Sequence, residues 1–173
     1  MKNIIPILSA AVLILSSCSP AIRTADSDAK TDSAATTVVD SAAAKPLFAT
    51  MKINSTINTG DSVKLKFTVY NTADSVQQFC KWHTPFEPLM SKYLDVKAEN
   101  GEEASYKGAT AKRIMPPPAD SYIKVNPGDS LSIDVDVLKG YAITKPGKYS
   151  IHYNAQNMSG LIVKDGVVFV YGK

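Results

Sequence analysis

The sequence contains few of the residues that usually carry enzyme chemistry, with two cysteines, two histidines and one tryptophan among 173 residues. It has no glycine-rich phosphate loop, no constellation of paired carboxylates and no nucleophile motif. Its net charge of +3 is too close to neutral for the dense basic surface that nucleic-acid phosphates require. We therefore predict a protein that is not an enzyme, uses no cofactor and binds no nucleic acid.

The sequence also lacks an apolar run long enough to span a bilayer as a mature helix. The apolar run from Ile4 to Leu15 follows Lys2 and precedes small residues, which is the layout of a secretory signal. Leu15-Ser16-Ser17-Cys18 resembles a bacterial lipobox, in which the peptide is cut before a cysteine that carries fatty acyl chains such as palmitate. The alternative is an ordinary signal peptide with an incidental cysteine. We expect residues 1–17 to be the signal peptide and lipid on Cys18 to anchor the protein to a membrane.

The scarcity of cysteine limits how the fold can be stabilised. If Cys18 carries lipid, Cys80 is the only thiol left, and no intramolecular disulfide can form even in an oxidising compartment. Ser19 follows Cys18 without an acidic cluster, a pattern that resembles outer-membrane lipoproteins of Gram-negative bacteria. We expect the protein in the bacterial cell envelope, most simply on the outer membrane facing the periplasm, and as a monomer.

The stretch after the cysteine lacks the residues that build a core. Residues 19–46 are mainly alanine, serine, threonine and aspartate, with no aromatic residue and no apolar period. Such a segment cannot bury enough apolar surface to offset the entropy lost on ordering. We predict that residues 18–46 form a disordered tether, with a reach of roughly 30 Å.

From residue 47 to residue 173 no helical stripe is present, and short alternating runs are separated by turn residues. In Ser62 to Asn71, four apolar residues alternate with polar ones, which indicates a half-buried strand. The same period recurs from Leu131 to Val137 and from Tyr149 to Tyr153. Asp165-Gly166 lies between two apolar runs and predicts a hairpin. We predict an all-β fold, a single antiparallel β-sandwich of immunoglobulin-like type.

Several short motifs follow one another in an order that is recognisable. They are Lys81-Trp82-His83-Thr84-Pro85, Tyr106-Lys107-Gly108, Val125-Asn126-Pro127-Gly128-Asp129-Ser130, Val135-Asp136-Val137 and Gly147-Lys148-Tyr149-Ser150-Ile151-His152-Tyr153. The series resembles the amino-terminal, immunoglobulin-like domain that precedes the catalytic domain in deuterolysin-like and peptidyl-Lys metalloendopeptidases. Those enzymes bind zinc through an H-E-x-x-H motif, which this sequence lacks. The resemblance implies a free-standing version of a domain that acts as a pro-region, without peptidase activity.

The stretch FCKWHTPFEPL, residues 79–89, concentrates the rarest residue types. If residues 79–83 are extended, Cys80 and Trp82 share one face and point toward the core, which is our prediction. One alternative is a thiol nucleophile at Cys80 activated by His152, although the sequence identifies no third group to orient the histidine. Another is a metal site of Cys80, His83 and His152, which lacks a fourth ligand. We predict no catalytic residue and no metal site.

Two proline-rich stretches supply the candidate contact residues. Pro85 and Pro88 frame one loop, and Pro116 to Pro118 stiffen a second. Their apolar residues either cap one end of the sandwich or form a surface that binds another protein. The candidate partner-binding residues are Phe86, Leu89, Met90 and Met115. The basic run between the loops, residues 107–113, is interpreted as a solvated loop.

Two functional hypotheses follow. The first is a membrane-anchored envelope lipoprotein whose non-catalytic immunoglobulin-like domain binds a protein and regulates a protease, as a pro-domain or inhibitor does. The second is a structural or assembly accessory of the outer membrane that binds glycan or an envelope machine.

Overall fold

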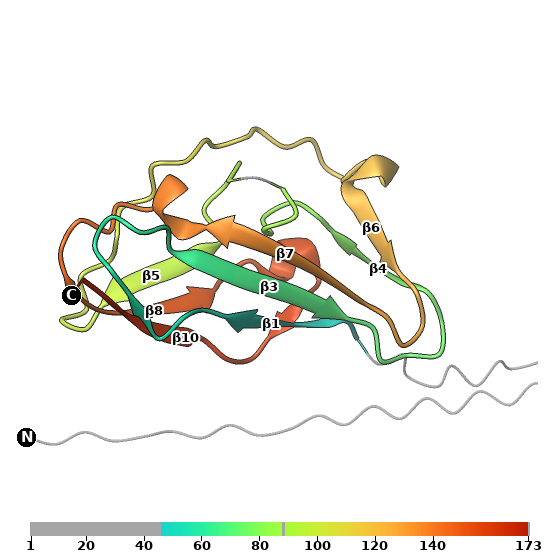
Figure 1. The fold of residues 1–173 in the computed structure, drawn as a ribbon. Helices are drawn as coiled ribbons and strands as arrows, with labels where there is room; N and C mark the ends of the chain where they lie inside the picture. Colours follow the sequence, from blue (N-terminus) through green and yellow to red (C-terminus); the bar gives the residue numbers. More distant parts are fainter. Residues whose placement is uncertain (1–45, 88, 173) are drawn as a thin grey trace, which may run out of the picture. The chain divides into compact units, whose positions relative to one another are not determined.

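A computed structural model describes residues 46–87 and 89–172 of the chain. The predicted signal peptide, Cys18 and all of the predicted tether except Pro46 lie outside these residues. The regular secondary structure of the described part is almost entirely β, and Figure 1 shows its arrangement. The strands are β1 (Phe48–Lys52), β2 (Thr56–Ile57), β3 (Lys64–Tyr70), β4 (Gln77–Cys80), β5 (Leu94–Ala98), β6 (Tyr122–Val125), β7 (Ser130–Asp136), β8 (Gly147–Tyr153), β9 (Ile162–Val163) and β10 (Val167–Tyr171). The helical pieces are the 3₁₀ turns η1 (Ala119–Ser121) and η2 (Val137–Lys139) and the short α1 (Gln156–Ser159).

The strands form two four-stranded sheets and one small two-stranded sheet. The first large sheet has the order β7-β3-β1-β9, and the second has the order β2-β10-β8-β5. β4 pairs with β6 in the small sheet, which Figure 1 shows at one end of the domain. The pairings are antiparallel except β1 with β9 and β2 with β10, each two residues long. The predicted all-β sandwich is confirmed.

The alternation of apolar and polar residues in the sequence determines which face of β3 and of its neighbour β7 packs toward the core. Val63, Leu65, Phe67 and Val69 are all fully buried, while Lys64 and Lys66 are exposed. Opposite β3, the edge strand β7 pairs Ile133 with Phe67 and Val135 with Leu65. On this pair Thr68 and Ser132 also share a hydrogen bond of 2.8 Å between their hydroxyl groups. A period of two residues in the sequence therefore becomes one apolar face of the first sheet.

The prediction of a carboxy-terminal hairpin is wrong. β9 pairs with β1 in the first sheet, whereas β10 lies between β2 and β8 in the second, so the chain crosses between sheets at Asp165-Gly166. A two-residue hairpin turn at this position needs a positive φ, and Gly166 is not among the glycines that have one. A Cβ atom on Gly166 would lie 2.5 Å from the ring of His152 and 2.8 Å from the carbonyl oxygen of Ile151. The glycine therefore permits close contact with β8, and it does not form a hairpin turn.

Candidate partner-binding site

The FCKWHTPFEPL stretch leaves the small sheet sooner than predicted. β4 ends at Cys80, and residues 82 and 83 lie in a turn in which His83 has a φ of 57°. Residues 79–83 are therefore not extended throughout, because a left-handed residue ends an extended run. Cys80 and Trp82 are buried as expected, but neither belongs to the main core cluster, which instead contains Phe79.

The first proline-framed loop contributes more to the core than to the surface. Phe86 packs edge-on against Phe79, with ring centroids 5.3 Å apart, and against Phe67 at 6.4 Å. Leu89 covers Gly140 so closely that a Cβ atom there would lie 2.7 Å from a Leu89 methyl carbon. Both side chains are partly buried and pack on the core cluster. Phe86 and Leu89 therefore cap the end of the sandwich and do not present an exposed contact surface.

The basic run of residues 107–113 is exposed at Lys107 and Lys112, as the sequence predicts, but Arg113 at its end is largely buried. Its guanidinium lies over the ring of Trp82, 4.6 Å from the centroid, and forms an ion pair with Glu87. The side chains of Arg113 and Glu87 are only 17% and 13% exposed. Nothing in the local sequence signals this pair, because its members lie 26 positions apart.

The arginine fixes the second loop to the first. The amide of Ala111 donates a hydrogen bond of 2.9 Å to the carbonyl of Met90, and the Tyr106 hydroxyl lies 2.7 Å from the carbonyl of Leu89. At the other end, the amide of Lys81 donates to the carbonyl of Ser121 at 2.8 Å. The two proline-rich loops therefore lie side by side at the same end of the domain.

Between these attachment points the second loop is exposed. Ile114 is 81% exposed and Met115 is 63% exposed, while Met90 on the first loop is 38% exposed. Of the four residues proposed for partner binding, the structure therefore leaves Met90 and Met115 accessible. Ile114 is the residue that sequence reasoning missed, although its position directly before Met115 and three prolines was a usable signal.

The titratable groups near these loops do not form a catalytic arrangement. Burial and the neighbouring Arg113 charge lower the pKa of His83 from its usual 6.5, partly opposed by Glu87. Burial raises the pKa of Tyr141 to about 12 and raises those of Tyr93 and Tyr153 further. In the described residues no hydrogen bond joins Cys80 to a histidine, and His152 is exposed on β8. These phenols stay protonated at neutral pH and supply no general base.

Within residues 46–87 and 89–172, no group of three or more histidine, cysteine, aspartate or glutamate side chains could hold a metal ion. No helix in the same range is long and apolar enough to cross a membrane.

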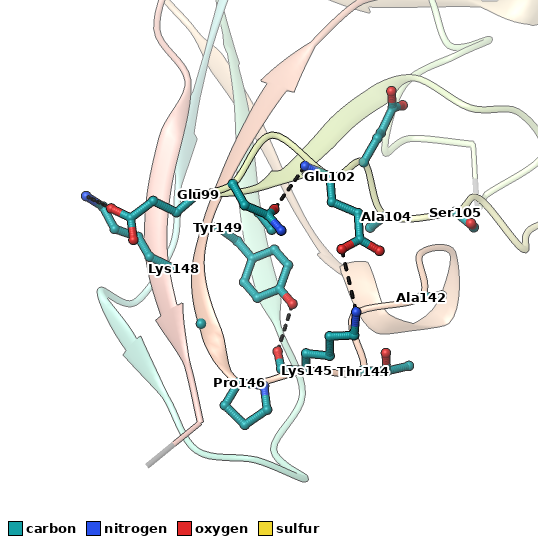
Figure 2. Close-up of a pocket in the computed structure, with 14 residues that line it drawn as sticks. Glu99, Glu102, Ala104, Ser105, Ala142, Thr144, Lys145, Pro146, Lys148 and Tyr149 are labelled. Carbon is teal, nitrogen blue, oxygen red and sulfur yellow. Dashed lines mark hydrogen bonds and ion pairs between the residues drawn. The ribbon is translucent and has the colours of Figure 1, made fainter.

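A separate pocket of about 580 Å³ lies where the loop after β5 faces the start of β8 (Figure 2). Two ion pairs flank it, Lys148 with Glu99 at 3.3 Å and Lys145 with Glu102 at 3.6 Å. The Tyr149 hydroxyl donates to the carbonyl of Lys145 at 2.7 Å, and the ring of Tyr149 is buried. These four charged side chains are exposed and paired with each other, and the lining of the pocket offers no exposed aromatic ring on which a sugar could stack.

Comparison with known proteins gives two findings. A family model described as an immunoglobulin-like domain matches residues 50–159, which include both proline-rich loops and most strands. The chain is also similar to a protein named extracellular protease from Aeromonas hydrophila, with 31% identity over 96 residues. The matched region covers 54% of this chain but only 26% of that protein, so the chain spans about a quarter of its relative's length.

Proposed function

The chain belongs to the immunoglobulin-like domain family, and we propose that it is an envelope lipoprotein, anchored through Cys18, whose domain binds and regulates a protease without chemistry of its own. The similarity to part of a protein named extracellular protease supports a protease-related role. The resemblance to a pro-region domain points the same way. Residues 18–46 hold the domain off the outer membrane on its periplasmic side, where it meets exported proteins.

The observation that carries this proposal is the exposure of apolar residues on a loop that is itself fixed. Ile114 and Met115 face solvent, while Arg113, directly before them, is buried against Trp82 and Glu87. Removing a solvent-exposed apolar side chain from water by covering it with a partner stabilises the complex. A loop that is already held in place loses little conformational entropy on binding. This combination favours a binding surface over a solvated loop.

Affinity capture with crosslinking tests the proposal. The tagged full-length chain serves as bait in its own envelope, and a Met90→Ser, Met115→Ser double variant serves as the loop variant. Val76→Ser is the matched control, because Val76 is an exposed apolar residue, at 53%, outside these loops. We expect one protease to be enriched by the wild-type chain and by the control, and to be lost with the loop variant.

Two other outcomes count against the proposal. If no protein is enriched above an unrelated lipoprotein, the loop is a cap and the domain has no such partner. If proteins of polysaccharide assembly or transport are enriched in place of a protease, the chain is an assembly accessory of the outer membrane, the second hypothesis from the sequence.

A further inference from the structure

The two large sheets end in four outer strands, of which β7 is the one that is both long and uncovered (Figure 1). The outer strands β9 and β2 are each two residues long. β5 is covered by its own chain, because the amide of Ala98 donates to the carbonyl of Glu102 and the amide of Ala104 donates to the carbonyl of Val96, both at 2.8 Å. β7 is seven residues long, and in the part of the chain that the structure describes no backbone other than that of β3 pairs with it. A free edge of this length is a template for a further strand.

The register of β7 with β3 determines which backbone groups point to the free edge. The amide of Val137 donates to the carbonyl of Val63 at 2.9 Å, and the amide of Asn71 donates to the carbonyl of Asp129 at 3.0 Å. These two bonds lie at the two ends of the ladder, and in an antiparallel pair only every second residue bonds with the neighbouring strand. The odd-numbered residues of β7 therefore bond with β3, whereas the even-numbered residues direct their N–H and C=O groups to the free edge.

β7 lacks the features that commonly protect a free edge from pairing. Its sequence, SLSIDVD, contains no proline, glycine or lysine, and its seven residues pair with β3 without a bulge. The residues at the free edge, Ser130, Ser132 and Asp134, have short, exposed side chains on the outer face of the sheet. On the core face, Leu131 and Ile133 are only partly buried. A further strand would satisfy the free backbone groups and cover the remaining apolar surface.

The outer face of β7 is complementary to a second, antiparallel β7. If Ser132 lies on a twofold axis, it faces Ser132 of the second copy, and Asp134 faces Ser130 of the second copy. The hydrogen bond of 2.8 Å between the hydroxyl groups of Thr68 and Ser132 is then extended by a further hydroxyl group across the axis. Each Asp134 stays beside Lys66 of its own β3, and no carboxylate faces another.

From these observations we infer that two copies of this chain pair along β7 and form a symmetric dimer with one continuous eight-stranded sheet. Leu131 of each copy lies opposite Ile133 of the other, so the core face of the pair is apolar on both sides of the axis. Twofold pairing uses each β7 once, so the assembly closes at two copies and leaves neither with a long free edge. The inference goes beyond the proposed function, does not depend on it, and replaces the monomer expected from the sequence.

Site-specific crosslinking in intact envelopes tests the inference. Two differently tagged copies of the full chain, both carrying Ser132→Cys, are expressed together and treated with a short bis-maleimide. Directly paired residues of this kind have Cα atoms about 5.5 Å apart, so we expect a product of twice the chain's mass that carries both tags. The controls are the wild type and Val168→Cys, because Val168 is exposed but lies on β10, an inner strand of the second sheet. Neither control should give this product.

A proline variant tests the pairing without a crosslinker. Ser132→Pro removes an amide that points to the free edge, so it costs no hydrogen bond to β3, and its ring blocks a second strand. We expect the amount of one tagged copy that co-purifies with the other to fall about tenfold or more. Ser132→Ala, which keeps the amide, is the matched control and should co-purify like the wild type. Circular dichroism checks that each variant is folded, and Asp134→Pro, which removes another outward amide, replaces a variant that is not.

Three results would overturn the inference. The first is no doubly tagged product from Ser132→Cys above the two controls. The second is a product with one tag and a different mass, which would show that the edge of β7 pairs with another protein. The third is unchanged co-purification of a folded Ser132→Pro variant, which would place the contact between copies elsewhere. None of these results bears on the proposed function, which is tested at the proline-rich loops.

Discussion

Buried tyrosine hydroxyl groups in this domain differ in whether they have hydrogen-bond partners. The Tyr93 hydroxyl is buried without a partner among the described residues, whereas the Tyr153 hydroxyl donates to Ser159 Oγ at 2.7 Å. An unpartnered buried hydroxyl is unfavourable, and a satisfied one is favourable. We predict that Tyr93→Phe raises the free energy of unfolding by about 1 kcal/mol and that Tyr153→Phe lowers it by about 1 kcal/mol. Urea denaturation measures the free energy of unfolding of both variants. An equal loss of stability in the two would show that the Tyr93 hydroxyl has a hydrogen-bond partner.

His83 makes stability depend on pH in a defined direction. Its pKa is lowered in the folded state, first by burial and then by the charge of Arg113, from the 6.5 of a free histidine. Above pH 6.5 the ring is neutral in both the folded and the unfolded state, so protonation of His83 does not reduce the free energy of unfolding there. As the pH falls below 6.5 the unfolded chain takes up the proton first, so the free energy of unfolding decreases until the pH reaches the folded pKa.

We predict that His83→Asn reduces this loss of stability between pH 7.5 and pH 5. Asparagine tolerates the positive φ of 57° at this position better than most residues, so the variant should fold. The measurement is urea unfolding at several pH values, with His152→Asn, at an exposed position, as the control. An unchanged pH slope in the His83 variant would assign the pH dependence to other groups.

At the scale of elements, the reliable predictions came from residues whose periodicity extends over a whole strand. β3, β7 and β8 each carry an alternation of at least three apolar residues, and each formed as expected. The segment around Asp165-Gly166 was predicted wrongly because a short-range turn signal cannot distinguish a hairpin from a crossing between sheets. That distinction depends on the partners of β9 and β10, which lie far away in the sequence.

The contact between Gly166 and β8 gives a prediction at the same scale. Gly166→Ala should lower the free energy of unfolding by about 1–3 kcal/mol, because the added methyl group overlaps His152 and the Ile151 carbonyl. Adding His152→Ala should recover only part of this loss, since the backbone carbonyl stays in place. Thermal or urea unfolding of the two variants measures the difference. Full recovery in the double variant would show that only the histidine ring is in contact.

At the scale of the whole molecule, the sequence indicated which stretches contain the candidate contact residues, but it did not indicate how those stretches pack against the rest of the domain. It identified Met90 and Met115 within proline-rich loops, and both are exposed. It could not assign Phe86 to the core, because its ring contacts Phe67, which lies 19 positions earlier. It also treated Arg113 as one charge in a basic run, since the partners that bury it, Trp82 and Glu87, lie at least 26 positions away.

Attachment to the membrane is a property of the whole chain and depends, in our proposal, on one atom, the sulfur of Cys18. Each buried CH2 group of an acyl chain contributes about 0.8 kcal/mol, so several chains hold the protein more firmly than one. We predict that cells grown with an alkynyl palmitate label the wild-type chain and the Cys80→Ser variant, but not Cys18→Ala. Cys80 is the matched control because its thiol is buried in the folded domain and inaccessible to an acyl donor. Labelling that survives Cys18→Ala would mean that the lipid is carried elsewhere, and the proposed outer-membrane tether would fail with it.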